Sequence, residues 1–463
     1  MPSPARTQAT EQLLTEYQAE RNGRLVSASR PAPDLTPPRF LAQAAGQARI
    51  YWRDGNTGVT FAGMGAALEL FGYGENRYRT VERQARQLFA QATSAADNAL
   101  AAPRLFGGFA FSDDFIPDVA WSAFHPAHFI LPHYQLACCN GESWLTINAL
   151  IPDGESVAEA RLGLQEALAD RLALLSEQTC QVSENLADLA PLIDYPLSYA
   201  EWERMIETAH GAFGTTLLKK VVLSRICQLR SQHAIDTDAA LAQLDARYPG
   251  CYTFLFEPRP HHAFLGAPPE LLVGVQGDRL ETMGLAGSAP RGVTPQEDAA
   301  NGAALLASAK DRHEHALVVD ALRRRLTPIT RCLEIADEPQ LLTLSNIHHL
   351  RTPVNGTLCD PRGVLPLVEL LHPTPALGGS PRELALDFIQ QHEPTLRGWY
   401  AGPVGWIDAN LDGAFAVAIR AAVVQKKRAW LYAGGGIVPG SVAEKEWEET
   451  EWKFRPMLGV LNA

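Results

Sequence analysis

The chain has 463 residues, of which 46% are hydrophobic and 20% are charged, as is typical of globular proteins. Its formal net charge of −12 argues against a general role on nucleic acids or membrane surfaces, because both need clustered Lys and Arg. No apolar stretch approaches the ~20 residues that span a bilayer, and no secretion signal is recognisable at the start, so we expect a cytoplasmic protein. Seven cysteines without a Cys-x-x-Cys pair indicate reduced core residues.

The first part of the chain has the pattern of a structural half. Residues 1–40 predict an N-terminal helix followed by a proline-rich extended connection. Short β-type runs then alternate with Gly and Asp turns from 49 to about 152. A helix is predicted over 157–177, and a polar connection over 178–198. Ionisable groups are not clustered here, so we expect no chemistry from this half.

The composition changes from residue 199 onward, where strand and helix patterns mix. We predict a helix over 199–211, a strand over 217–225, hairpins over 254–275 and 414–433, and helices around 298–325, 381–391 and 441–458. The basic run 426–428 is predicted to be a hairpin turn. Because the strands come as hairpins and do not alternate with helices, we expect antiparallel sheets with helices packed outside, an α+β fold.

Two adjacent lysines lie in the strand predicted over 217–225. Alternation places Lys220 and Lys219 on opposite faces, so one of them lies among apolar neighbours if either face is core. A buried lysine favours the neutral amine, which can act as a general base. The pattern does not say which lysine this is, and an edge strand with solvated lysines is equally compatible.

Glu270 is surrounded by Pro, Leu and Val in the second strand of the hairpin predicted over 254–275. A carboxyl group among aliphatic side chains tends to a raised pKa, as a general acid near neutrality requires. The alternative is a solvent-exposed glutamate at the start of a strand.

Near the C-terminus, Glu446, Glu449 and Lys453 fall on one face of the predicted helix. Two carboxylates and an ammonium could hold a hard cation and a carboxylated ligand together, although such faces are often solvated ion-pair ladders. Glu314, in the segment 310–315, could join them from another helix and complete an oxygen set that suits Mg²⁺. Zinc is not expected, because the histidines at 313 and 315 diverge on a helix.

Glycines and single cations supply further candidates. The glycine-rich run 434–440 leaves bare backbone that an anion can approach, and the turn 284–288 offers backbone N–H groups and a hydroxyl, unless it is a plain hairpin connection. In a strand predicted over 414–424, Ile419 shares a face with other apolar residues and Arg420 lies opposite. Arg420 could hold a carboxylate or form a surface salt bridge. His349 could be catalytic or structural.

Taken together, these segments resemble the chorismate-utilising enzyme family. The resemblance covers about residues 200–460 and is carried by the segments 219–225, 266–271, 286–288, 310–315, 349–352, 372–383 and 434–453. It implies large, mostly antiparallel sheets in a sandwich-like core with helices outside. It also implies a variable N-terminal half, 1–195, and a chorismate-binding catalytic half, 196–463, intertwined as one domain, and a monomer with no nucleic-acid or membrane partner.

Within the family, the run from His372 to Glu383, with Pro375 and Ala376, is most similar to isochorismate synthases. By this resemblance Lys220 would deprotonate the water that attacks C2 of chorismate, while Glu270 would protonate the departing C4 hydroxyl. Glu314 and Glu449 would bind Mg²⁺, and Glu446 would assist directly or through water. The residues expected to contact or line the substrate are Gly287, Ser288, His349, Thr374, Ala376, Leu377, Tyr400, Ile419, Arg420, Gly434 and Lys453.

The resemblance leaves the use of the product open. Isochorismate feeds menaquinone or catechol siderophores, and the long N-terminal half mildly favours menaquinone. A salicylate synthase, which uses the same lysine, is the alternative enzyme. A catalytically silent paralogue is disfavoured, because Lys220, Glu270, Glu314 and Glu449 are all present.

Overall fold

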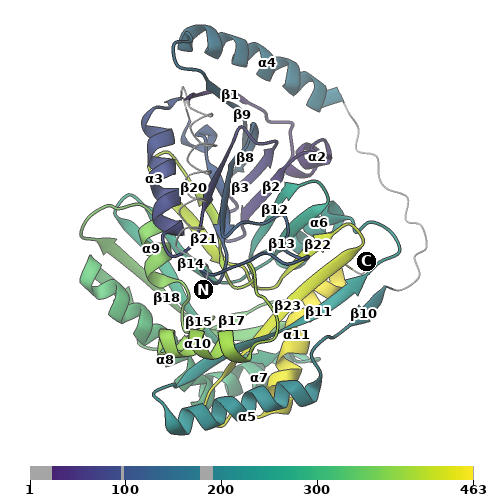
Figure 1. Cartoon of the computed structure of the whole chain (residues 1–463), viewed down its shortest axis with the longest axis vertical. Helices are drawn as coiled ribbons and strands as arrows, with labels where there is room; N and C mark the ends of the chain where they lie inside the picture. The colour runs from purple at the N-terminus through teal and green to yellow at the C-terminus, as the bar shows by residue number, and fades with distance from the viewer. Residues whose placement is uncertain (1–22, 95–97, 178–190, 462–463) are drawn as a thin grey trace, which may run out of the picture.

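A computed structural model describes residues 23–94, 98–177 and 191–461. Two large β-sheets form the centre of this part of the chain, and helices cover their outer faces (Figure 1). The expected α+β fold with mostly antiparallel sheets is therefore confirmed. Within the described residues, no helix is long and apolar enough to cross a membrane.

The larger sheet runs in the order β10-β11-β23-β22-β13-β12-β2-β3-β8-β9-β1-β5, with β19 paired to β11. Its strands are antiparallel, except that β5 runs parallel to β1. The strands are β1 (Arg24–Pro31), β2 (Arg49–Asp54), β3 (Thr60–Met64), β5 (Thr93–Ser94), β8 (Tyr134–Cys139), β9 (Glu142–Ile151), β10 (Leu192–Asp194), β11 (Lys220–Arg230), β12 (Tyr252–Arg259), β13 (His262–Gly266), β19 (Gly379–Ser380), β22 (Ala421–Gln425) and β23 (Arg428–Ile437).

The second sheet is antiparallel, in the order β16-β18-β15-β14-β21-β20-β6-β7-β4, with β17 paired to β18. Its strands are β4 (Leu68–Gly72), β6 (Leu105–Phe109), β7 (Ala127–Leu131), β14 (Leu271–Gln276), β15 (Arg279–Pro290), β16 (Thr330–Ile335), β17 (Gln340–Thr343), β18 (Ile347–Leu358), β20 (Pro403–Ile407) and β21 (Gly413–Val417).

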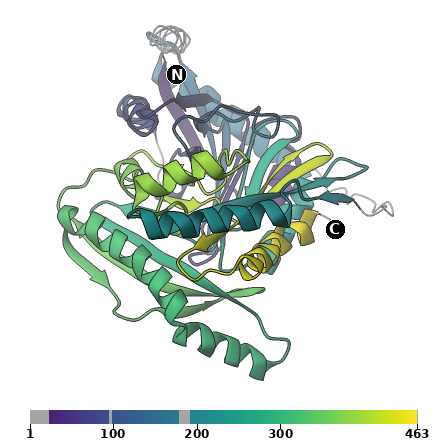
Figure 2. The ribbon, with the colours of Figure 1, turned by 60° about the horizontal axis from the view of Figure 1, so that its bottom comes forward.

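Helices pack on the outer faces, and those nearest the site come from the second half of the chain. In Figure 2, α5, α10, α8 and α11 lie along one side of the molecule, where α8 packs on β15, α10 on β11 and α11 on β23. The helices are α2 (Pro37–Ala42), α3 (Arg77–Ala90), α4 (Val157–Glu177), α5 (Tyr199–Thr215), α6 (Thr237–Arg247), α7 (Pro295–Ala307), α8 (Ala309–Leu326), α9 (Leu365–Leu371), α10 (Arg382–His392) and α11 (Ala443–Leu461), with 3-10 turns at Ala99–Ala101 and Thr327–Ile329.

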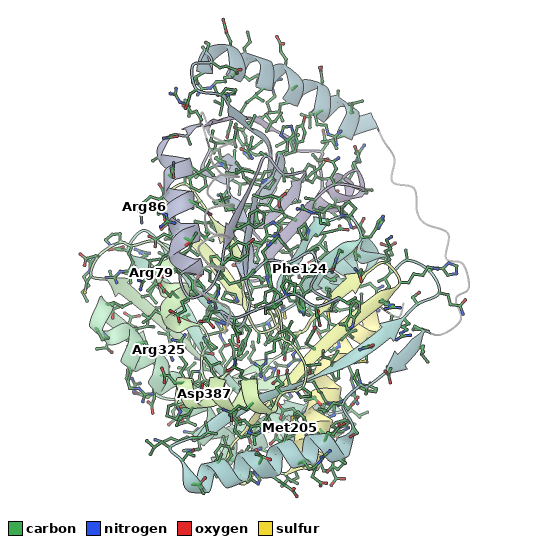
Figure 3. The ribbon with its side chains drawn as sticks, in the orientation of Figure 1. Arg79, Arg86, Phe124, Met205, Arg325 and Asp387 are labelled. Atoms are coloured by element: carbon green, nitrogen blue, oxygen red, sulfur yellow. The ribbon has the colours of Figure 1, made fainter. Side chains whose placement is uncertain are left out.

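Aromatic side chains link the two sheets in the hydrophobic core, where Phe61 of β3 contacts Phe106 of β6 and Trp406 of β20. Figure 3 labels another core aromatic, Phe124. Phe124 is at the centre, 1% exposed, and its ring packs edge-on against the rings of Trp121 and Trp399 at centroid distances of 5.3 and 5.5 Å. Edge-to-face contacts of this kind add to the free energy gained by burying the rings. The site described below is therefore built on a tightly packed frame.

Each sheet joins the two halves of the chain at one seam. In the larger sheet β2 pairs with β12, and in the second sheet β6 pairs with β20. Apart from the short edge strand β10, the strands on one side of each seam come from the first half and those on the other side from the second half. Backbone hydrogen bonds thus run continuously from one half into the other.

Three expectations about elements need correction. Arg24–Pro31 forms strand β1 between β9 and β5, where only an extended connection was predicted, because the sheet supplies partners that the proline-rich pattern does not reveal. The helix expected over 298–325 is two helices, because Ser308 ends α7 and caps α8. Cys332 and Cys359 are exposed, not core residues. Residues 1–22, most of the predicted polar connection, and Cys180 lie outside the described residues.

The two hairpins predicted over 254–275 and 414–433 are wrong in the same way. Strands β13 and β22 belong to the larger sheet, whereas β14 and β21 belong to the second sheet, so the chain passes from one sheet to the other once within each of these two segments. The crossings, at 267–270 and 418–420, lie side by side: the Ala267 N–H donates to the Arg420 carbonyl at 3.1 Å, and the Val417 N–H donates to the Glu270 carbonyl at 3.1 Å. The true hairpins are β12–β13 and β22–β23, and the latter turns at the basic run as predicted.

Candidate active site

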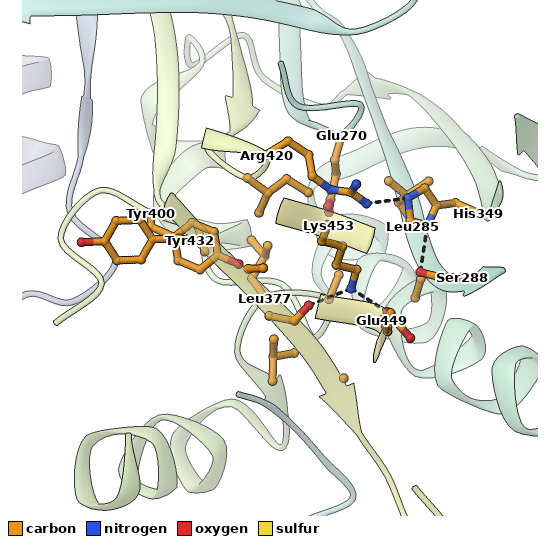
Figure 4. A pocket seen from close by; sticks show the side chains of 18 of the residues that line it. Glu270, Leu285, Ser288, His349, Leu377, Tyr400, Arg420, Tyr432, Glu449 and Lys453 are labelled. Carbon is orange, nitrogen blue, oxygen red and sulfur yellow. Dashed lines mark hydrogen bonds and ion pairs between the residues drawn. The ribbon is translucent and has the colours of Figure 1, made fainter. Parts of the chain in front are cut away.

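A cavity with about 700 Å³ of empty space, part of it open to solvent, lies beside these two crossings. Figure 4 shows its lining, with side chains from both sheets and from α11 directed into one space. Thirteen of the sixteen predicted site residues line it, namely Glu270, Gly287, Ser288, Glu314, His349, Ala376, Leu377, Tyr400, Ile419, Arg420, Gly434, Glu449 and Lys453. The other three, Lys220, Glu446 and Thr374, are buried next to it. Their chemical roles stay predictions.

Lys220 is the buried lysine of the pair and Lys219 is exposed. It begins β11, and its Nζ lies 2.8 Å from Glu314 Oε1 on α8. Gly436 on the neighbouring strand makes room for this ion pair, since a Cβ there would lie 2.2 Å from Glu314 Oε1 and 2.9 Å from Lys220 Cε. The structure thus resolves the choice that alternation alone left open.

Glu270 occupies the first crossing, one residue before β14. Its side chain is buried, and burial raises its pKa to about 8, although Lys220 and then Lys453 act in the opposite direction. The carboxyl group is therefore protonated at neutral pH and can donate a proton. The predicted pKa shift is supported, but the hairpin setting assumed for it is not.

Helix α11 carries the charged face that the sequence indicates. Arg225 on β11 holds the helix in place: its Nε donates to Thr450 Oγ1 at 2.7 Å, and its guanidinium lies 3.5 Å from the Trp447 ring centroid. Glu446 is buried, and its Oε1 accepts from Lys310 Nζ at 2.7 Å.

Glu449, one turn further along α11, has a different environment. Its Oε1 lies 2.6 Å from Lys453 Nζ, which also donates to the Gly434 carbonyl at 2.7 Å. Burial raises the pKa of Glu446, and the charge of Glu449 adds to that effect. For Glu449, burial acts in the same direction, but the hydrogen bond and charge of Lys453, together with Lys310 and His349, outweigh it and leave the pKa below its usual value.

Glu314, Glu446 and Glu449 form what we call the carboxylate cluster. All three carboxylates act on one ammonium, because together they raise the pKa of Lys310 even though its burial alone would lower it. Among the described residues no group of three or more metal-ligating side chains is already gathered closely enough to hold an ion. The donor chemistry nevertheless fits a hard cation such as Mg²⁺, since every candidate ligand is a carboxylate.

A chain of hydrogen bonds orients His349 and Arg420 (Figure 4). Arg420 Nη2 donates to His349 Nε2 at 3.0 Å, while His349 Nδ1 lies 3.1 Å from both Ser288 Oγ and the Gly287 carbonyl. Burial, followed by the charge of Arg420, lowers the pKa of His349 to about 3, so the ring is neutral. With its proton on Nδ1, His349 is a structural partner that aims the guanidinium.

Arg420 reaches the cavity by a route that strand alternation could not give. The strand predicted over 414–424 is interrupted at 418–420, and Arg420 has a left-handed backbone with φ of 51°. Its side-chain direction follows from this local twist at the crossing, not from period-two alternation. Ile419, in the same crossing, also lines the cavity.

An aromatic wall and the segment 372–381 close the remaining sides. Tyr400 stacks on Tyr432 with ring centroids 5.1 Å apart. Ala376 and Leu377 line the cavity, whereas Thr374 is buried beside it and its hydroxyl has no hydrogen-bond partner among the described residues. The segment continues into β19, which pairs with β11 at Lys220. It therefore adjoins the buried lysine directly.

Sequence reasoning missed Arg397, Tyr432 and Lys310. Arg397 lines the cavity and holds three segments together: it donates to the Leu377 carbonyl at 2.9 Å, to the Val222 carbonyl at 2.7 Å, and to Glu393 at 2.6 Å. No local pattern distinguishes a buried Arg from the surface ones. Tyr432 looked like an ordinary strand residue. Lys310 lies in the segment 310–315 that also contains Glu314. Its i, i+4 spacing from Glu314 is a signal that places both side chains on one helix face.

The arrangement combines a candidate proton donor, a candidate base and anion-binding groups at one cavity. Glu270 is the candidate proton donor, and Lys220 is the candidate base. Lys453 and Arg420 are cations placed to bind carboxylates. Such a site can add and remove water on a small dianionic molecule.

Comparison with known proteins gives one consistent result. The profile of a family described as chorismate binding enzyme matches residues 9–462. The salicylate biosynthesis isochorismate synthase of Pseudomonas aeruginosa is 36% identical over 89% of this chain and 85% of its own length. The isochorismate synthase MenF of Bacillus subtilis is 33% identical over 95% of this chain and 93% of its own length. The solved structure of MenF from Escherichia coli superimposes with a TM-score of 0.77 at 26% identity over 98% of both chains. The chain therefore belongs to the family of chorismate-binding enzymes.

Proposed function

We propose that this protein is an isochorismate synthase that converts chorismate reversibly into isochorismate. The observation that carries the proposal is the pairing, at one cavity, of a protonated carboxyl group on Glu270 with the buried Lys220. The relatives support the same reaction, since those named above are isochorismate synthases. Membership of the family, by itself, would leave several chorismate reactions open.

In the proposed mechanism Lys220, which begins β11, and Glu270, at the crossing before β14, act on the ring from two different elements. Lys220, as the free amine, takes a proton from the water that attacks C2, and both double bonds of the ring diene move by one position as the C4–O bond breaks. Glu270 gives its proton to the departing hydroxyl, which leaves as water. One water enters and one leaves, so the product is an isomer of the substrate and the reaction is reversible.

The charges of the site suit a dicarboxylate. Chorismate is a dianion, and a protein with a net charge of −12 must offset its own field locally to bind it. We expect Lys453, the Gly434 backbone and the 287–288 turn to hold one carboxylate. Arg420, aimed by His349, and Tyr400 would contact the enolpyruvyl end. Ala376, Leu377 and Ile419 would pack against the ring.

Mg²⁺ is the proposed cofactor, bound by Glu314 and Glu449 with Glu446 assisting directly or through water. When bound, the ion would supply a positive charge that holds the ring carboxylate. Removing it with EDTA should abolish turnover, and adding MgCl₂ should restore it. Glu314→Gln should raise the Mg²⁺ concentration needed for half-maximal rate, whereas a rate unaffected by EDTA would contradict the assignment.

For the pathway we propose menaquinone synthesis. The MenF relatives resemble this chain over nearly its whole length, although the Pseudomonas relative is named for salicylate biosynthesis. Deleting the gene in its own host should deplete menaquinone while leaving catechol siderophores or salicylate unchanged. The reverse result would assign the enzyme to siderophore or salicylate synthesis. A monomer remains our expectation, which light scattering of the purified chain can test.

A product assay tests the reaction itself. The purified protein, incubated with chorismate and Mg²⁺, should yield isochorismate and approach the same mixture when started from isochorismate. Salicylate together with pyruvate would identify a salicylate synthase, the alternative enzyme. A product that forms only when ammonia is added would reject both.

A further inference from the structure

Each member of the carboxylate cluster is matched with one lysine. Glu314 pairs with Lys220 at 2.8 Å, Glu446 with Lys310 at 2.7 Å and Glu449 with Lys453 at 2.6 Å. Three negative and three positive charges are thus balanced without any bound ion. Unpaired carboxylates this deeply buried would repel one another and lose hydration, so this balance stabilises the site as it stands.

Lys310 differs from the other two lysines in its position. Its side chain is 39% exposed, compared with 1% for Lys220 and 16% for Lys453. It stands in the first turn of α8, and the proposed reaction assigns it no contact with the substrate. Of the three, it is the lysine that can move into solvent with the least loss of packing.

Lys310 nevertheless interacts with all three members of the carboxylate cluster. Its ammonium donates a hydrogen bond to Glu446, and the negative charges of Glu314 and Glu449 also stabilise its charged form. A divalent cation bound by the same carboxylates would lie next to the Lys310 ammonium, which is hydrogen-bonded to Glu446. Like charges a few ångströms apart in a partly buried site repel each other, so the ammonium and the ion do not share Glu446 without a loss of binding energy.

We infer that Lys310 is an internal cation that neutralises the carboxylate cluster in the metal-free protein and competes with a divalent ion for Glu446. The ammonium must withdraw toward solvent for the ion to bind. Lys310 therefore lowers the affinity for the metal and stabilises the empty site. This inference rests on the proposed Mg²⁺ site and adds a residue that sets its occupancy.

The test measures metal binding directly, without turnover. Purified protein, stripped with EDTA and dialysed, is titrated with MgCl₂ in a calorimeter. Lys310→Met should bind Mg²⁺ about tenfold more tightly than the parent protein, which corresponds to about 1.4 kcal/mol. Lys310→Arg keeps the charge and should keep the parent's weaker affinity. Lys445→Met removes an exposed charge on α11, next to Glu446 in sequence, and should change affinity little.

Thermal unfolding supplies a second measurement. In EDTA the midpoint of Lys310→Met should fall below that of the parent protein, and MgCl₂ should raise the variant's midpoint by more than it raises the parent's. If Lys310→Met fails to fold, Lys310→Gln, which keeps a hydrogen-bond donor without the charge, should show the same tighter binding.

The outcomes separate this inference from the proposed function. Unchanged or weaker Mg²⁺ binding in both Lys310→Met and Lys310→Gln would overturn the inference while leaving the metal site in place. An equal gain for Lys445→Met would show a general charge effect and would also overturn it. No Mg²⁺ binding to the parent or any variant would overturn the inference and the proposed cofactor together. The proposed reaction would then still be judged separately by the product assay.

Discussion

Two carboxyl groups on the wall of one cavity have pKa values displaced in opposite directions. Burial raises the pKa of Glu270 to about 8, whereas at Glu449 the effects of Lys453, Lys310 and His349 together outweigh burial and leave the pKa below its usual value. At neutral pH Glu270 therefore carries a proton that it can donate, whereas Glu449 is an anion. The separation of their roles comes from the environment of each residue, since the side chains are chemically identical.

Glu270→Gln tests the proton donor. If Glu270 is the general acid, turnover should fall by roughly 10²–10⁴-fold, because glutamine cannot release a proton. In the parent protein the rate from chorismate should decline as pH rises through about 8, where Glu270 loses its proton. A product assay across pH 6–9 measures both effects. A variant rate close to that of the parent would exclude Glu270 from the acid role.

The same substitution should alter the pH dependence of stability. The folded-state pKa of Glu270, about 8, lies above its ordinary value of 4.5. Protonated Glu270 thus contributes stability that is complete below the unfolded pKa and lost as pH rises through the folded one. Between these values the unfolding free energy of the parent should fall relative to Glu270→Gln, by at most about 1.4 kcal/mol per pH unit. Urea denaturation at pH 5 and pH 8 measures this difference. If the unfolding free energies of the parent and of Glu270→Gln changed by the same amount between the two pH values, the assignment would be contradicted.

Lys220 and Lys219 provide a matched pair for the base. Lys220→Ala should abolish isochorismate formation and retain the circular dichroism spectrum of the parent. Lys219→Ala, which removes an exposed lysine one residue away, should retain nearly full turnover. Comparable activity of the two variants would remove Lys220 from the base role.

At the scale of elements, strand β23 matters because its glycines leave room for side chains from other elements. Gly436→Ala would place a Cβ 2.2 Å from Glu314 Oε1 and should displace the Lys220–Glu314 ion pair. Turnover should drop by at least about tenfold, which corresponds to only 1.4 kcal/mol. Gly435→Ala is the control, since the nearest atom to its Cβ would be Glu446 Oε2 at 3.4 Å, close to an ordinary contact. Equal activities of the Gly436→Ala and Gly435→Ala variants would show that the close approach of Glu314 to Gly436 is unimportant for turnover.

For the whole molecule, the two seams predict that neither half folds alone. Without residues 1–195, the edges of β12 and β20 lose their partners β2 and β6, and apolar strand edges of this kind aggregate. We expect 196–463 expressed alone to be insoluble or to lack cooperative unfolding, and co-expression with 1–195 to improve its solubility. A soluble, active 196–463 fragment would show instead that the first half is dispensable.

Much of the fold and of the site follows from local sequence. Period-two runs identify most strands of the second half, and helical spacing places Glu446, Glu449 and Lys453 on one face of α11. Helix α4 has the predicted bounds, Val157–Glu177. These features depend on contacts between residues a few positions apart, which the sequence displays directly.

Only the tertiary structure decided which groups meet. Period-two patterns look alike in either sheet, so they could not show that the chain crosses between the sheets at 267–270 and 418–420 and thereby carries Glu270 and Arg420 to one cavity. Burial singled out Lys220 from Lys219, and partners more than a hundred residues away set the environments of Lys310 and Arg397. The sequence by itself determined the chemical types and the family resemblance. Their distances, burial and charge pairing depend on long-range packing, which no local pattern encodes.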